Sequence, residues 1–238
     1  MINNPPYAYS SESDLLLDIH IPKIKSDKLP VMVYIHGGSY QIGGPLDYPG
    51  NDEFVKQGNV ILVVIQYRIG LAGFFSWNEG DSVHANFALY DQIKSLQWIN
   101  ENISLFGGDS NNVTIFGESA GSFSVDQLIR SDLAVPYFHR AIGQSGCLVS
   151  TWTCQTERSW EKCQDAYLKH FEVRTVDDLK QKLRNLPYQE LLQHEQELRA
   201  KGHSYLTRVD KNLITVNFQP HKRPYIIGEN HYEKQTTK

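Results

Sequence analysis

The chain is short of sulfur-containing residues, since three of its 238 residues are cysteine and two are methionine. Cys147, Cys154 and Cys163 cannot all pair within the chain because their number is odd, and their spacing matches no zinc-binding pattern. We therefore expect ordinary thiols with at most one disulfide, no metal site and no cofactor.

Long apolar runs are absent as well. No segment approaches the roughly 20 apolar residues that a transmembrane helix requires, so no membrane span is expected. Residues 1–10 have neither the basic start nor the apolar centre of a signal peptide. The chain as written is therefore expected to be cytoplasmic.

A surplus of positive charge is also missing, because 23 Lys and Arg residues stand against 27 Asp and Glu residues, for a net charge of −4. This balance argues against nucleic acid as a partner. Hydrophobic residues make up 40% and charged residues 21% of the chain, proportions that are ordinary for a soluble globular protein.

The patterns that are present predict alternating strands and helices. Residues 29–35 and 60–67 are apolar runs rich in β-branched side chains, typical of strands buried on both faces of a parallel sheet. Apolar residues at spacings of three and four from Ala85 to Ile103 predict an amphipathic helix that ends at Gly107. Further strands are expected at 15–21, 113–116, 140–144 and 225–228, and further helices at 52–57, 119–129, 157–171, 176–184 and 187–200.

This alternation favours a doubly wound, mostly parallel α/β sheet in one domain, residues 1–238, with a site at the carboxyl ends of the strands. Residues 11–152 would hold the sheet core. From residue 153 to 223 the chain is charged, rich in glutamine and helical in period, which predicts a helical cap-like region.

The pentapeptide from Gly117 to Gly121 follows an apolar run and precedes a predicted helix. A strand, sharp turn and helix of this kind present the hydroxyl of Ser119 at the edge of the sheet, where it can attack a carbonyl. A side chain at either glycine would collide with neighbouring strands in so tight a turn. Ser119 is therefore the candidate nucleophile.

A second glycine motif, His36-Gly37-Gly38, ends the predicted strand 29–35. Gly37 and Gly38 let the backbone approach a substrate closely and point N–H groups toward it. Together with the N–H of Ala120 they would form an oxyanion hole. The alternative is a glycine turn without chemistry, but the two motifs in this order favour a serine hydrolase.

These motifs belong to a wider resemblance. The chain resembles the type-B carboxylesterase and cholinesterase family of α/β-hydrolases from about residue 11 to 152, and more weakly to 233. The segments that carry the resemblance are 29–38, 66–70, 91–92, 106–109, 111–121 and 138–146. The resemblance implies the α/β-hydrolase fold.

The resemblance also implies roles for individual residues. Ser119 matches the nucleophile, and the amides of Gly38, Ser39 and Ala120 match the oxyanion hole. Ser39 stands where the family usually has a third glycine. Glu118 matches a carboxylate that organises the site through water. Trp152 falls where the family often has an aromatic wall of the acyl pocket; a tryptophan of the core or surface is the alternative.

The triad acid of this family lies five residues beyond a glycine that ends an apolar strand. Counting from Gly228 gives Glu233, with a charge in a solvated tail as the alternative. The family's histidine lies beyond its acid, and none follows Glu233, so we expect the fold to be truncated before its last strand and catalytic histidine. His139 is expected to pack before a strand. Polar surfaces are expected for six further histidines, namely His84, His170, His194, His203, His221 and His231.

The resemblance implies a hydrolase that cleaves small-molecule carboxylic esters through an acyl-enzyme. Because the base is missing, this chain alone is expected to be weak or inactive. The alternatives are a non-catalytic cholinesterase-like binding or adhesion protein and a truncated product without function. Relatives of this kind are often secreted, which leaves the compartment open.

Overall fold

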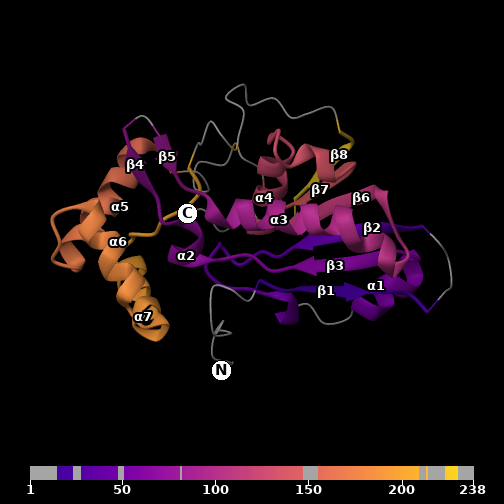
Figure 1. Ribbon diagram of the computed structural model, residues 1–238, viewed down its shortest axis with the longest axis horizontal. Helices are drawn as coiled ribbons and strands as arrows, with labels where there is room; N and C mark the ends of the chain where they lie inside the picture. Colours follow the sequence, from indigo (N-terminus) through magenta and orange to yellow (C-terminus); the bar gives the residue numbers. More distant parts are fainter. Residues whose placement is uncertain are drawn as a thin grey trace.

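The computed structural model describes residues 15–23, 28–47, 51–80, 82–146, 155–208, 213 and 223–229. Its centre is a six-stranded sheet in the order β1-β3-β2-β6-β7-β8 (Figure 1). All neighbours pair in parallel except β1 and β3, which pair antiparallel. The predicted mostly parallel α/β sheet is confirmed.

The middle of the sheet consists of β2 (Leu29–Ile35), β3 (Ile61–Ile65) and β6 (Gly108–Glu118). All five residues of β3 are buried, as expected from its continuous apolar sequence. In β2, buried and half-buried residues alternate because successive side chains point to opposite faces. Val31 pairs with Ile61 on one side and with Val113 on the other.

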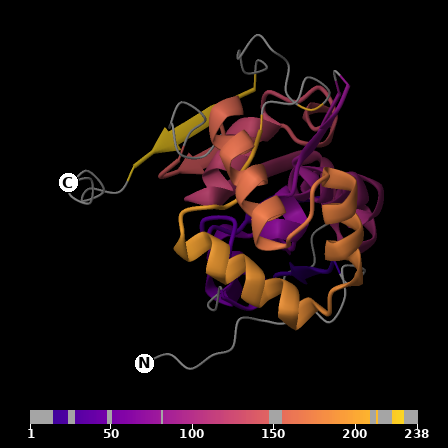
Figure 2. The ribbon, with the colours of Figure 1, turned by 90° about the vertical axis from the view of Figure 1, so that its left-hand side faces the viewer.

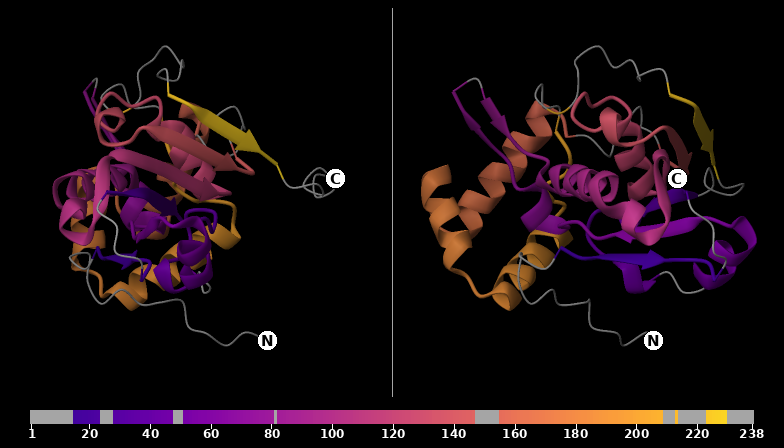
Figure 3. Two further views of the ribbon diagram at one scale, coloured as in Figure 1. Left: turned by 90° about the vertical axis from the view of Figure 1, so that its right-hand side faces the viewer. Right: turned by 45° about the vertical axis from the view of Figure 1, so that its right-hand side comes forward.

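Shorter strands flank this centre. β1 (Leu17–His20) forms one edge, and β7 (Arg140–Gln144) and β8 (Tyr225–Gly228) extend the sheet on the other side (Figure 3). β8 is the edge strand, and the side chains of Ile226 and Ile227 are exposed.

Helices cover both faces of the sheet. On one face α1 (Asn51–Gly58) contributes Val55 to a small cluster with Leu62 and Val64 of β3. The larger core on the other face contains side chains from α3 (Phe87–Asn102), α4 (Ala120–Leu128) and the short α2 (Gly70–Phe74). This arrangement is the doubly wound one predicted from the alternation of strands and helices.

The predicted long helix differs slightly from the structure at its end. α3 stops at Asn102, and Ile103 begins the short 3-10 helix η2 (Ile103–Phe106). Gly107 closes η2 with φ 83°, a left-handed conformation that glycine adopts at little cost. Two further 3-10 turns are η1 (Pro45–Asp47) and η3 (Val135–Tyr137).

Three helices follow β7 along the chain and lie together beyond one end of the sheet (Figures 1 and 2). They are α5 (Glu157–His170), α6 (Val176–Asn185) and α7 (Tyr188–Ala200), close to the predicted ranges. A two-stranded hairpin of β4 (Trp77–Glu79) and β5 (Ser82–His84) lies nearby and was not predicted. Of the helices in the described ranges, none has both the length and the apolar character needed to cross a bilayer.

Specific contacts fasten these helices to the sheet domain. The indole of Trp160 donates to the carbonyl of Ser76 at 3.2 Å, and the guanidinium of Arg208 lies 3.8 Å from the centre of the Trp160 ring. Arg208 also bonds to Glu157 at 2.7 Å. The division into a sheet core at 11–152 and a cap-like region at 153–223 stays a prediction.

Candidate active site

Ser119 occupies the sharp turn between β6 and α4. Its backbone angles, φ 53° and ψ −121°, lie in a region that non-glycine residues rarely adopt. Two hydrogen bonds hold it there: its N–H donates to the carbonyl of Gln144 at 2.9 Å, and its carbonyl accepts from the N–H of Phe123 at 3.0 Å. Strain at this residue is therefore maintained by β7 on one side and by α4 on the other.

The glycines of this turn have no room for a side chain. A Cβ on Gly121 would collide with the carbonyl oxygen of Ile35 in the neighbouring strand β2. A Cβ on Gly117 would lie 2.7 Å from that same oxygen and 2.6 Å from the carbonyl carbon of Gly121. The close approach of α4 to β2 thus requires glycine at both positions, for the steric reason expected from the sequence.

The second glycine motif lies directly against this turn. A Cβ on Gly37 would be 2.7 Å from the carbonyl oxygen of Glu118 and 3.3 Å from Cβ of Ser119. Gly38 and Ser39 have φ values of 110° and 56°. Ser39 therefore reaches a left-handed conformation at the position where the related family has glycine.

Three backbone amides near Ser119 are available to a ligand. The N–H groups of Gly38, Ser39 and Ala120 have no hydrogen-bond acceptor within the described ranges. Ala120 is the first residue of α4, where an N–H has no partner inside the helix. Such donors, together with the positive end of the helix dipole, suit an oxygen that becomes negatively charged.

His36 stabilises the loop of Gly37 and Gly38 by packing and by a hydrogen bond. Its ring is buried and stacks on Tyr67 with 4.2 Å between ring centres. Nδ1 lies 2.9 Å from the carbonyl oxygen of Gly37, so the proton is on Nδ1 because a carbonyl can only accept. Burial lowers the pKa of His36, which keeps the ring neutral at pH 7.

Further residues position the site and were not singled out from the sequence. Ser122 in α4 donates to the carbonyl of Gly146 at 2.6 Å, which ties the helix to the loop after β7. The hydroxyls of Tyr40 and Ser124 are 3.2 Å apart, and Gln92 donates to Ser124 at 3.1 Å. No local pattern marks these residues, because their partners are 24 to 84 positions away.

The structure describes the nucleophile but no partner for it that would act as base. Among the described residues, no side chain forms a hydrogen bond with Oγ of Ser119. Glu233 and Trp152 lie outside the described residues, so their roles stay predictions. Glu118 is half-buried at the end of β6, with Oε2 3.1 Å from the position of a Gly37 Cβ. Its proposed action through water is likewise a prediction.

His139 packs at the start of β7 as expected, where its Nδ1 accepts the N–H of Val113 at 3.2 Å. Burial and the nearby guanidiniums of Arg223 and Arg140 lower its pKa. The ring therefore connects β6 to β7 through the hydrogen bond at Nδ1, which argues against a role of His139 as the base.

The sheet topology, the serine turn and the adjacent glycine loop together define an α/β-hydrolase. The model of the carboxylesterase family matches residues 2–237. The chain therefore belongs to the carboxylesterase family.

Named relatives agree with this assignment. Carboxylesterase 1D of Rattus norvegicus is 44% identical over 149 residues, which cover 62% of this chain and 26% of the relative. Liver carboxylesterase 1F of the same species is 48% identical over 138 residues, which cover 57% of this chain and 24% of the relative. The chain thus aligns with about a quarter of the length of these relatives.

Solved structures are similar over more of the chain. A PNB esterase superimposes with a TM-score of 0.83 at 28% identity, covering 99% of this chain and 53% of the esterase. A thermophylic PNB esterase gives a TM-score of 0.81 at 28% identity, and the superposition covers 94% of this chain and 48% of the esterase. The described sheet and helices therefore correspond to about half of a larger esterase.

Proposed function

We propose that Ser119 attacks carboxylic esters of small molecules and forms an acyl-enzyme that water then cleaves. The observation that supports this proposal is the positive φ of Ser119, 53°, directly beside Gly37, because a serine in such a turn presents its hydroxyl to a substrate near the backbone amides. Membership of the carboxylesterase family supports it.

The chemistry follows from that geometry. Oγ of Ser119 bonds to the acyl carbon, its proton passes to a base, and the alcohol leaves with a proton returned by that base. The amides of Gly38, Ser39 and Ala120 donate to the oxygen that becomes negative. Each such donor is worth about a hundred- to a thousandfold in rate. Water then repeats the sequence and releases the acid.

The proton transfer sets the rate that we expect. The seven histidines in the described ranges form no hydrogen bond with Ser119. Because no described base contacts Ser119, purified residues 1–238 are expected to hydrolyse esters slowly, on the order of a thousand times faster than water alone. Added imidazole can act as the base.

We further propose that the helices α5 to α7 form part of a cap over the site. β2, β3 and β6 run parallel, so their carboxyl ends lie at one end of the sheet together with Ser119. α2 follows β3 at this end, and its Leu71 N–H donates to Glu195 of α7 at 2.8 Å. The cap helices therefore border the end of the sheet that carries the nucleophile (Figure 2).

The test is hydrolysis of p-nitrophenyl acetate by purified residues 1–238, with and without imidazole. Ser119→Ala should remove all activity above the imidazole background. Ser104→Ala serves as the matched control, because Ser104 is exposed in η2 before the start of β6, at the opposite end of the sheet. If Ser119→Ala retained the activity of the unaltered chain while circular dichroism showed it folded, the proposal would be wrong.

A further inference from the structure

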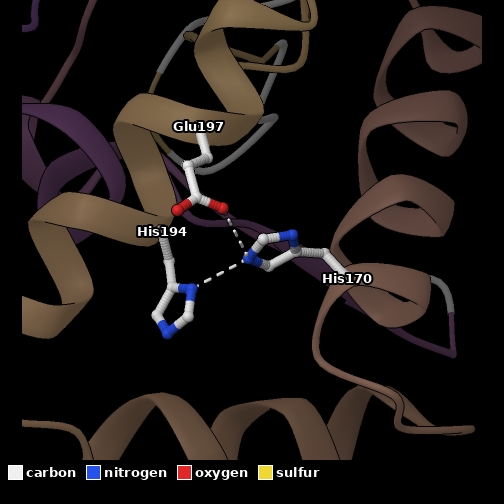
Figure 4. Close-up of side chains that lie close together, drawn as sticks. All are labelled: His170, His194 and Glu197. Atoms are coloured by element: carbon white, nitrogen blue, oxygen red, sulfur yellow. Dashed lines mark hydrogen bonds and ion pairs between the residues drawn. The ribbon is translucent and has the colours of Figure 1, made fainter.

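His170 and His194, two of the histidines expected on polar surfaces, are in contact with each other. His170 is the last residue of α5, and His194 and Glu197 lie one turn apart on α7 (Figure 4). Nε2 of His170 is 2.9 Å from Nδ1 of His194 and 4.0 Å from Oε2 of Glu197. One potential ligand atom from each residue lies within 4.8 Å of the other two.

We propose that His170, His194 and Glu197 bind a divalent transition-metal ion of the Zn²⁺ type that joins α5 to α7. Two imidazole nitrogens and one carboxylate oxygen are ligands that Zn²⁺ accepts, with a water in the fourth position.

Two of the three distances between ligand atoms are close to those of a complete site, and all three are within 4.8 Å. Zinc–ligand bonds of about 2.0–2.1 Å in a tetrahedron place neighbouring ligand atoms roughly 3.3 Å apart. To reach this geometry, the two nitrogens would have to move about 0.4 Å further apart, and the carboxylate oxygen of Glu197 would have to move about 0.7 Å closer to Nε2 of His170. Glu197 can make this movement because 61% of its side chain is exposed.

The His170–His194 hydrogen bond needs one protonated and one bare nitrogen, which two neutral rings can provide. On metal binding the bridging proton moves through water to the other nitrogen of its own ring, so both lone pairs face the ion and no net proton is released.

The surroundings hold the rings and favour a cation. The ring of Phe171 packs edge-on against His170 and His194, with ring centres 5.1 and 4.8 Å apart, which restricts how both imidazoles can turn. His170 ends α5, where the helix dipole is negative. Because the three ligands come from two helices, an ion here would bind the folded chain and not the unfolded one.

The experiment titrates Zn²⁺ into the untagged, chelator-treated chain by calorimetry. We expect one ion per chain, and His170→Gln and His194→Gln should weaken binding by more than about tenfold, the lower bound for a change next to a metal ligand. Glu197→Gln tests the exposed third ligand with the fold intact. His84→Gln is the control, because His84 pairs with Glu79 in the hairpin and is not in the cluster.

Two readouts separate this site from other zinc binding. Co²⁺ should give the absorption of a tetrahedral nitrogen and oxygen site without thiolate charge-transfer bands. Zn²⁺ at about a hundred times its Kd should raise the Tm of the unaltered chain by roughly 5–10 °C, but not that of His194→Gln. No binding, equal binding by Glu197→Gln and the unaltered chain, or thiolate bands would overturn the proposal. None of these readouts depends on ester hydrolysis.

Discussion

Gly37 and Ser119 lie so close together that one methyl group on Gly37 would be 3.3 Å from Cβ of Ser119 and 2.7 Å from the carbonyl oxygen of Glu118. The two residues are far apart in the sequence, yet parallel pairing of β2 with β6 brings Ile35 opposite Gly117 and so places the two turns side by side. The relationship makes the glycine loop and the serine turn one unit.

The first prediction concerns that contact. Gly37→Ala must push the loop away from Ser119, because the opposing atom is backbone and cannot swing aside. We expect imidazole-supported hydrolysis of p-nitrophenyl acetate to fall by about a hundredfold, the effect of losing one oxyanion donor. Gly58→Ala is the matched control, since Gly58 has no left-handed φ and its Cβ would be 3.4 Å from Cγ2 of Val60, an ordinary van der Waals contact. Equal rates for the two variants would contradict the contact.

The second prediction concerns the partly buried ion pair of Arg68 and Asp91. Asp91 accepts from Nε and from the terminal nitrogen of Arg68, each at 2.7 Å, and its side chain is 8% exposed. Asp91→Ala removes the carboxylate partner of Arg68 and should lower the free energy of unfolding by about 3 kcal/mol in urea denaturation. Asp177→Ala removes the exposed partner of Lys180 and should cost less than about 1 kcal/mol. Equal losses would refute this ranking.

The third prediction is a pH dependence. Burial raises the pKa of Glu195 from 4.5 to about 7, although the Leu71 amide and Arg199 oppose the rise. Between these two pH values the folded chain holds a proton that the unfolded chain has released, so this residue makes stability fall as the pH rises. Glu195→Gln lacks this titration. Its Tm relative to the unaltered chain should increase from pH 4.5 to 7 and then level off; a difference that stays constant would contradict the assignment.

The fourth prediction concerns Cys163 on α5. The side chain is buried, and burial raises the pKa of its thiol to about 12, so almost no thiolate forms at pH 8. Iodoacetamide should leave Cys163 unmodified in the folded chain and alkylate it in urea, as read by peptide mass spectrometry. Rapid alkylation without denaturant would show that α5 does not pack as described.

Local pattern predicted most of the regular structure. Residues 29–35, 140–144 and 225–228 have the predicted strand bounds because apolar runs between turn residues leave few alternatives. The hairpin of β4 and β5 was missed because it has few apolar residues. Tertiary contacts stabilise it instead, including the stacking of Trp77 on His84 and the ammonium of Lys180 over the Trp77 ring. The Gly80-Asp81 dipeptide of the sequence was the available signal.

Part of the candidate site could likewise be predicted from local sequence patterns, and part could not. Ser119 and the glycine motif were found because each lies in a short stretch with its own turn chemistry. The contacts that depend on the tertiary fold could not be found, since Leu71 and Glu195 are 124 residues apart and His170 and His194 are on different helices. Periodicity places a residue on one face of a helix, but it does not say which helix comes to lie opposite.

Covalent labelling by a fluorophosphonate is the most direct test of the central claim, that Ser119 is a nucleophile beside an oxyanion hole. With imidazole present as the base, the account predicts one label per folded chain, located on the peptide that contains Ser119, retained in Ser104→Ala and lost in Ser119→Ala. A chain that is folded by circular dichroism and carries no label, or carries it on another residue, would contradict the account.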